Sequence, residues 1–347
     1  MLGILILAAV IWLGGASMGI PARVRSTVLG LLYLAVLLAL WLSPQGVGAS
    51  LGGTAGEWLL LGGFAVLVWA YARGVKWLKM RAKPQSAPTQ AGPFSKTELG
   101  RYARHIILRE IGGPGQKRLK DARVLVIGAG GLGAPALQYL AAAGVGTIGV
   151  IDHDEVDNSN LQRQVIHKDA SIGTPKVFSA QSEMLAQNPH INVLPYHRRL
   201  DEPTAKDLFG DFDLILDGTD NFETRYLVNR VAAQAGKPLI SGALSQWEGQ
   251  ISLFDPANGS PCYQCVFPNA PAPGLAPSCA EAGVIGPLPG VIGSMMALEA
   301  VKLVAQVGEA LTGRMLIFDG LYGETRVMKL AKRADCPICG ESNKAEV

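Results

Sequence analysis

Long apolar runs dominate the N-terminal part of the chain. Met1–Ile20 holds no charged residue, and further apolar runs follow at Thr27–Leu42 and Trp58–Tyr71. A membrane-spanning helix needs about 20 predominantly apolar residues, which the first run has and the others reach with their flanks. A signal peptide fits the first run poorly, because no Lys or Arg follows Met1; buried core helices are the other alternative. We therefore predict a membrane anchor of three spanning helices within residues 1–77.

Basic residues predict how this anchor is oriented. Arg23 and Arg25 lie between the first two runs, and residues 43–56 contain no Lys or Arg. Five basic residues follow the third run, at Arg73, Lys76, Lys79, Arg81 and Lys83. Because cytoplasmic loops carry an excess of Lys and Arg, we expect a multi-pass protein of the cell inner membrane. Its N-terminus would face away from the cytoplasm, and everything after residue 73 would lie in the cytoplasm.

Behind the anchor, a Pro- and Gln-containing stretch at residues 78–93 is typical of a linker. Apolar runs of strand length then alternate with helical patterns, and the end of the chain is rich in strands. The predicted strands are 124–127, 147–151, 191–196, 212–216, 238–241, 249–254, 315–319 and 325–330, and the main predicted helices are 134–143, 176–185, 223–236 and 292–306. This order predicts a domain at 94–347 of the α/β class, Rossmann-like, with a mostly parallel sheet and an antiparallel extension.

The first strand of this domain leads into a glycine-rich turn. Gly128, Gly130 and Gly133 form a G-x-G-x-x-G motif between a strand and a helix, and Asp152 follows the next strand. Glycines allow the backbone to approach a phosphate, and an acid at this distance suits a ribose hydroxyl. The pattern predicts a nucleotide site, and a tight structural turn is the alternative.

Residues after the second strand favour a triphosphate over a dinucleotide. Arg163 and Lys176 add positive charge that attack at an α-phosphorus needs, because negative charge builds on the phosphoryl oxygens. Each could alone be a solvated surface charge. Asp220 follows a strand at the edge where open α/β sheets bind ligands, and it offers an oxygen ligand for Mg²⁺; a simple turn residue is the alternative.

Four of the five cysteines stand in two C-x-x-C pairs, Cys262 with Cys265 and Cys336 with Cys339. Four thiolates in this arrangement suit a structural Zn²⁺, although disulfides or redox dithiols are alternatives. Cys279 follows a Pro-rich segment and is either a nucleophile or an incidental cysteine.

Composition adds one exclusion. The chain is 49% hydrophobic, carries 17% charged residues and has a net charge of +3. So slight a positive charge gives no indication of nucleic-acid binding, and we expect no nucleic-acid partner.

Several motifs together resemble the MoeB, ThiF and HesA group of adenylyltransferases, which are related to ubiquitin-activating enzymes. In chain order they are RYARHIIL (101–108), VLVIGAGGLG (124–133), IDHDEVDNSNLQRQ (151–164), GTPK (173–176), DGTDN (217–221), EGQISLF (248–254), CYQC (262–265), SCAEAGVIGPLPGVIG (278–293) and CPICG (336–340). The resemblance covers about residues 94–341 and leaves the predicted membrane anchor outside.

The resemblance implies a role for individual residues. Gly131 and the neighbouring Gly128 and Gly130 would lie against the ATP phosphates, and Asp152 would hold the ribose. The phosphates and Mg²⁺ would be bound by the polar set Asn160, Arg163, Lys176, Asp220 and Asn221. Arg104 resembles an arginine that one subunit supplies to the other, which implies a homodimer. The paired cysteines match zinc ligands, and Cys279 matches a position at which some members form a thioester or persulfide.

The implied reaction is adenylylation of the C-terminal glycine of a ubiquitin-like sulfur-carrier protein ending in Gly-Gly, with release of pyrophosphate. The carboxylate is already ionised at neutral pH, so the reaction needs no general base. Molybdopterin, thiamine and related sulfur-transfer pathways all fit. The alternatives are an NAD(P)-dependent oxidoreductase and a membrane-tethered scaffold that binds nucleotide.

Overall fold

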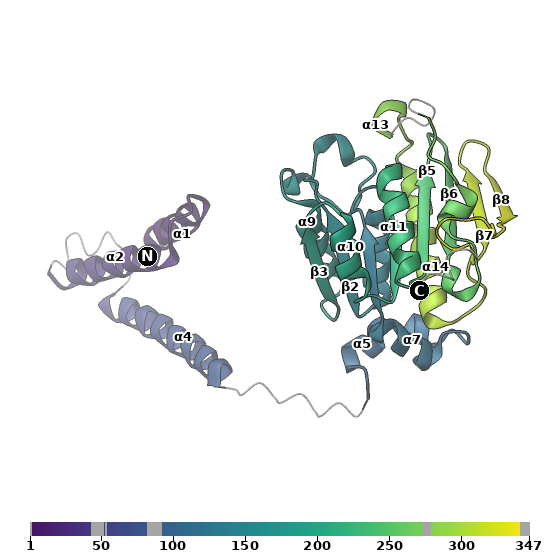
Figure 1. Ribbon diagram of the computed structural model, residues 1–347. Helices are drawn as coiled ribbons and strands as arrows, with labels where there is room; N and C mark the ends of the chain where they lie inside the picture. Colours follow the sequence, from purple (N-terminus) through teal and green to yellow (C-terminus); the bar gives the residue numbers. More distant parts are fainter. Residues whose placement is uncertain (1, 43–51, 53, 82–91, 273–278, 341–347) are drawn as a thin grey trace. The chain divides into compact units, whose positions relative to one another are not determined.

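The computed structural model describes residues 2–42, 52, 54–81, 92–272 and 279–340. The chain divides into two compact units, Met1–Thr89 and Gln90–Val347. The first unit contains the helices α1 (Leu2–Ser17), α2 (Ala22–Leu42) and α4 (Ala55–Arg81). The second contains all the described strands (Figure 1).

Two polar contacts link the helices of the first unit. Arg25 on α2 donates from Nη1 to the carbonyl oxygen of Trp12 at 2.9 Å, and its guanidinium lies 4.6 Å from the centre of the Trp12 ring. Tyr33, also on α2, donates its hydroxyl to the carbonyl oxygen of Trp58 on α4 at 2.7 Å. Most of the large apolar side chains of this unit remain exposed.

The helices α1, α2 and α4 of the first unit differ in length. In the described part of the chain, α2 and residues Ala55–Val75 are long and apolar enough to cross a bilayer, and little of either is buried. The helix α1 has 16 residues, which at 1.5 Å per residue is about 24 Å, shorter than the ~30 Å hydrocarbon core. It ends at Ser17 before a turn in which Gly19 has φ +72° and Pro21 follows. The helix α14 (Pro287–Ala305) also has the length and composition, but half of it is buried inside the second unit.

An eight-stranded sheet in the order β3-β2-β1-β4-β5-β6-β7-β8 forms the centre of the second unit. The strands β1 to β5 pair in parallel, and β6, β7 and β8 continue the sheet antiparallel. Their bounds are β1 Arg123–Ile127, β2 Thr147–Asp152, β3 Asn192–His197, β4 Leu214–Asp217, β5 Leu239–Leu244, β6 Glu248–Phe254, β7 Arg314–Asp319 and β8 Glu324–Lys329. The predicted α/β sheet with an antiparallel extension is therefore confirmed.

Helices cover both faces of the parallel strands because the buried side chains of β1 alternate. Val124 and Val126 pack in a core with α7 (Gly112–Asp121), α8 (Gly133–Ala143), α9 (Lys176–Gln187) and α14. Leu125 and Ile127 point to the other face and pack with residues of α10 (Glu202–Phe209) and α11 (Phe222–Gln234). The remaining helices are short: α5 Lys96–Arg101, α6 Ala103–Ile106, α12 Tyr263–Val266 and α13 Cys279–Ala282.

Among the helices of eight or more residues in the second unit, three differ from the sequence prediction. The helix α7 was not predicted, because its sequence opens with Gly-Gly-Pro-Gly; buried Leu119 and Gly115 secure it within the fold. The short α10, capped by the Asp201 side chain, was also missed. The helix α14 begins at Pro287 rather than at 292, since Pro fits the first turn of a helix. The helix α5 begins with a capping box formed by Ser95 and Glu98.

Candidate active site

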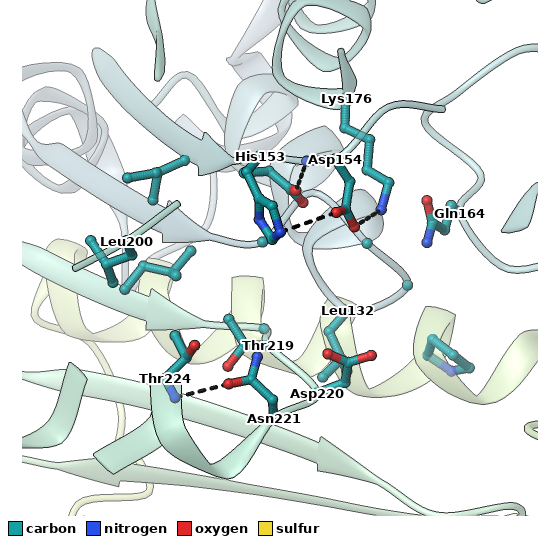
Figure 2. Close-up of a pocket in the computed structure, with 18 of the residues that line it drawn as sticks. Leu132, His153, Asp154, Gln164, Lys176, Leu200, Thr219, Asp220, Asn221 and Thr224 are labelled. Atoms are coloured by element: carbon teal, nitrogen blue, oxygen red, sulfur yellow. Dashed lines mark hydrogen bonds and ion pairs between the residues drawn. The ribbon is translucent and has the colours of Figure 1, made fainter. Parts of the chain in front are cut away.

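A pocket opens where the parallel strands β1, β2 and β4 end (Figure 2). It has about 910 Å³ of space including its open mouth. Figure 2 shows Lys176 and Asp154 on one side of it, and Asp220 and Asn221 on the other. Its lining includes the predicted residues Gly128, Gly130, Gly131, Asp152, Arg163, Lys176, Asp220 and Asn221.

Glycine is required at two points of the turn after β1, and a third glycine of the turn stands close to a neighbouring side chain. Gly128 has φ +90°, a conformation that other residues rarely adopt. A Cβ at Gly133 would lie 1.9 Å from the carbonyl oxygen of Gly128, so α8 can start directly against the turn. A Cβ at Gly131 would lie 3.0 Å from Cβ of Pro289, so a larger residue at this position would crowd the side of the pocket that Pro289 lines. The turn therefore presents bare backbone to a ligand.

Asp152 and His167 hold this turn in place. The Asp152 carboxylate accepts from the backbone N–H of Ala129 at 2.8 Å and of Asp154 at 2.9 Å. The buried His167 ring joins its Nε2 to the carbonyl oxygen of Ala129 at 2.9 Å, and its Nδ1 to the hydroxyl of Ser179 at 3.0 Å. Burial lowers the pKa of His167, so the ring stays neutral. Carboxylate oxygens have further lone pairs, and Asp152 can accept a ribose hydroxyl as well.

Lys176 brings a buried positive charge into the pocket from the first turn of α9. Its side chain is 6% exposed, and Nζ lies 2.7 Å from Oδ2 of Asp154. Burial raises the pKa of Asp154, but the hydrogen bond and the charge of Lys176 outweigh it, and the pKa is lowered. The ammonium has three donors, so it can hold Asp154 and a phosphate together.

Arg163 is held in position by its own turn. Its Nη2 donates to the side-chain oxygen of Asn160 at 2.6 Å, and Nη1 donates to the carbonyl oxygen of Ser159 at 3.3 Å. Asn160 is not among the residues that line the pocket, so the structure places it as a support for the arginine.

Asp220 ends the turn after β4, and buried Arg225 fixes this turn. Arg225 donates to the carbonyl oxygens of Thr219 and Gly242, and Asp217 accepts from the Thr219 backbone at 3.0 Å. Asn221 caps α11, accepting from Thr224 N at 2.9 Å. The exposed Asp220 faces the pocket, where its carboxylate can hold a divalent cation.

Arg104 and Cys279 are not among the residues that line the pocket. Arg104 is exposed on α6, between α5 and α7, and Figure 1 shows those two helices at the far end of the domain from α13. Cys279 is the first residue of α13, but its side chain lies outside the described part of the structure.

Sequence reasoning missed several pocket residues. Asp154 and Gln164 stand inside the motif that resembles the family, but neither was assigned a role. Arg198 and Arg199 directly follow β3 at the same edge as Asp152. Their position after a parallel strand was the signal that could have identified them.

The four paired cysteines gather away from the pocket as free thiols. Sγ of Cys262 lies 3.9 Å from that of Cys265 and 3.6 Å from that of Cys336, and Cys265 lies 3.4 Å from Cys339. Four sulfurs around Zn²⁺ at 2.3 Å would stand about 3.8 Å apart. Burial and the neighbouring thiols raise the pKa of Cys262. The thiolate form is therefore disfavoured here unless a cation is bound beside it. The residues fit a tetrahedral Zn²⁺.

A second hollow adjoins the pocket and shares Leu132, Thr219, Asp220 and Leu244 with it. Its other lining includes four aromatic side chains, Phe222, Tyr226, Tyr263 and Phe267, from α11 and the segment around α12, and the polar residues Arg225, Gln250 and Asn269. Asp220, which follows β4, therefore faces both the pocket and the second hollow.

Residues 102–338 match the model of the ThiF family. The chain is 47% identical over 252 residues to the sulfur carrier protein adenylyltransferase of Thermus thermophilus, covering 72% of this chain and 93% of the relative. It is 48% identical over 245 residues to the SAMP-activating enzyme E1 of Haloferax volcanii, covering 71% and 90%. This chain therefore belongs to the ThiF family, as its motifs predicted.

Among solved structures, MccB of E. coli has a similar fold. One of its crystal structures matches with a TM-score of 0.62 and 22% identity, over 71% of this chain and 76% of that chain. At this identity, the match concerns the fold alone.

Proposed function

We propose that this chain uses ATP to adenylylate the C-terminal glycine of a ubiquitin-like sulfur-carrier protein and releases pyrophosphate. The observation that carries the proposal is the joining, in one pocket, of a bare glycine turn with Asp152, Arg163, Lys176 and Asp220. The names of the Thermus and Haloferax relatives support an adenylyltransferase that acts on such carriers.

The residues would act by positioning and by stabilising charge. Asp152 holds the ribose, and the glycine turn receives the phosphates. Arg163 and Lys176 stabilise the charge that develops as the carrier carboxylate attacks the α-phosphorus and pyrophosphate leaves. Asp220 would bind Mg²⁺, which neutralises phosphate charge when present.

The aromatic hollow gives the carrier tail a route to the reaction. It shares Asp220, Thr219 and Leu132 with the nucleotide pocket, so a carrier tail lying in it could bring its carboxylate to the bound nucleotide. We therefore propose that the tail lies in this hollow.

Three further features belong to the proposal. The cysteine cluster binds a structural Zn²⁺. Arg104 reaches the pocket of a second copy in a homodimer, a role supported by its exposure on α6. The first unit anchors the chain in the inner membrane with its catalytic domain in the cytoplasm, supported by the two long apolar helices α2 and α4. The helix α1 has only 16 residues. If α1 does not span, the basic residues at the start of α2 and at the end of α4 would still share the cytoplasmic side.

The test is carrier-dependent exchange of labelled pyrophosphate into ATP, with the full chain in detergent and a small protein ending in Gly-Gly. We expect exchange only with the carrier present, and its loss in Asp220→Ala. Exchange that survives this change contradicts the assignment of the acid. A dehydrogenase would instead be stabilised by NAD in a thermal melt, whereas we expect stabilisation by Mg²⁺–ATP alone.

A further inference from the structure

Gln164 is a buried side chain of the pocket with an unused polar atom. The residue is 5% exposed and lines the pocket, and its Oε1 has no hydrogen-bond partner in the described part of the chain. Because a buried polar atom without a partner destabilises the folded state, such atoms are rare unless something else supplies the bond. Gln164 therefore points to a ligand that completes its hydrogen bonding.

The surroundings of Gln164 indicate which part of a ligand it meets. A Cβ placed on Gly130 would lie 3.6 Å from the Nε2 of Gln164, so the amide lies beside the glycine turn. The backbone N–H of Gln164 donates to the carbonyl oxygen of Asn160 at 3.0 Å, in the same turn that fixes Arg163. Figure 2 shows Gln164 on the side of the pocket where Lys176 lies. These neighbours are the groups suited to phosphate.

We propose that Gln164 binds the polyphosphate of the nucleotide by donating its Nε2–H to a phosphoryl oxygen. The assignment rests on the proposed function, since it takes a triphosphate as the ligand. Phosphoryl oxygens only accept at neutral pH, so they cannot pair with Oε1 itself. The terminal amide torsion has two comparable orientations, and a half-turn of the amide places Nε2 at the unpartnered position, from which it can donate to the ligand. Gln164 adds a directed donor without charge beside the cations Arg163 and Lys176.

A second buried glutamine provides the matched control. Gln116 is fully buried, and both its amide atoms are bonded within the domain. Its Nε2 donates to the carbonyl oxygen of Ala143 at 2.8 Å, and its Oε1 pairs with Nδ1 of His105 at 3.2 Å. Gln116 is thus bonded wholly within the protein and does not line the pocket, which makes the same substitution informative at both positions.

The experiment measures the Kd for Mg²⁺ with α,β-methylene-ATP by calorimetry, and the Tm without nucleotide, on the full chain in detergent. In Gln164→Met we expect Kd to rise roughly 10- to 100-fold, as for loss of a hydrogen bond to a charged group. Its nucleotide-free Tm should equal or exceed the wild-type value, because an unpaired polar atom is removed. In Gln116→Met we expect a lower Tm and a Kd within twofold of wild type.

Gln164→Glu tests the direction of the hydrogen bond. A carboxylate cannot donate and repels phosphate, so Kd should rise more in this variant than in Gln164→Met. The assignment of Gln164 is overturned if Gln164→Met leaves the Kd unchanged, or if Gln164→Glu binds as tightly as the wild-type chain. In either case the proposed function still stands, provided that the wild-type chain binds the nucleotide. A wild-type chain that binds no nucleotide overturns the proposed function, and the role of Gln164 with it.

Discussion

Replacing Lys176 by Met should remove most of the activity without unfolding the protein. The Lys176 side chain is 6% exposed, and among the residues that the structure describes its ammonium bonds only the half-exposed Asp154 carboxylate, at 2.7 Å. Water can solvate that carboxylate once the ammonium is gone, so stability should change little. The pocket loses a cation aimed at the charge of the transition state, and loss of one such group typically costs ~2.7–4 kcal/mol, or a factor of about 10²–10³ in rate.

Asp154 makes this prediction sharper. In Lys176→Met its carboxylate faces the triphosphate without the neighbouring ammonium, so part of the loss is repulsion. Adding Asp154→Asn should recover roughly tenfold, ~1.4 kcal/mol. Lys168→Met is the matched control, because Lys168 is 53% exposed, pairs with Glu183 and does not line the pocket.

The assay for all four proteins is carrier-dependent pyrophosphate exchange, with Tm as the measure of folding. We expect Lys168→Met to stay near wild type. The reasoning is refuted if Lys176→Met keeps its rate within about threefold, or if the double variant is no faster than Lys176→Met.

Other predictions follow from the same contacts. Burial lowers the pKa of His167 in the folded protein, so this side chain binds a proton more readily in the unfolded chain. The Tm should therefore fall as the pH drops below about 6.5, and this dependence of Tm on pH should be weaker in His167→Gln. Cys336→Ser should reduce the zinc measured by atomic absorption and lower Tm, whereas Cys279→Ser should keep its zinc; full zinc in the first variant would contradict the cluster. Gly131→Ala should raise the nucleotide Kd several-fold by calorimetry, since the new Cβ would lie 3.0 Å from Pro289. An unchanged Kd would contradict this prediction and show that Pro289 can move aside.

Much of the fold could be predicted because its strands are apolar runs bounded by turns. The strand β1 and the glycine turn were identified to within a residue, since only glycine fits that approach. Residues 292–306 were predicted as a helix of the α/β domain, and α14 is present there with half of it buried inside that unit. The helix α7 could not be predicted, because its stability comes from tertiary packing and not from its Gly-Gly-Pro-Gly start.

The pocket could be predicted only in part. Gly128, Asp152, Lys176 and Asp220 each follow a strand or begin a helix at the carboxyl edge of the sheet, which sequence order reveals. The role of Asn160 as a support for Arg163 depends on side-chain geometry, and no spacing rule indicates it. The Lys176–Asp154 pair and the unpaired oxygen of Gln164 likewise become visible only when the chain is folded.

Mass measurement of the carrier C-terminus tests adenylate formation most directly. The full chain would be incubated with Mg²⁺–ATP and a small protein ending in Gly-Gly, and the reaction would be stopped in acid. We predict a carrier that has gained one AMP, together with an equal amount of pyrophosphate, and far less of both products with Lys176→Met. A carrier of unchanged mass, while ATP is consumed or NAD is bound instead, would contradict the proposal.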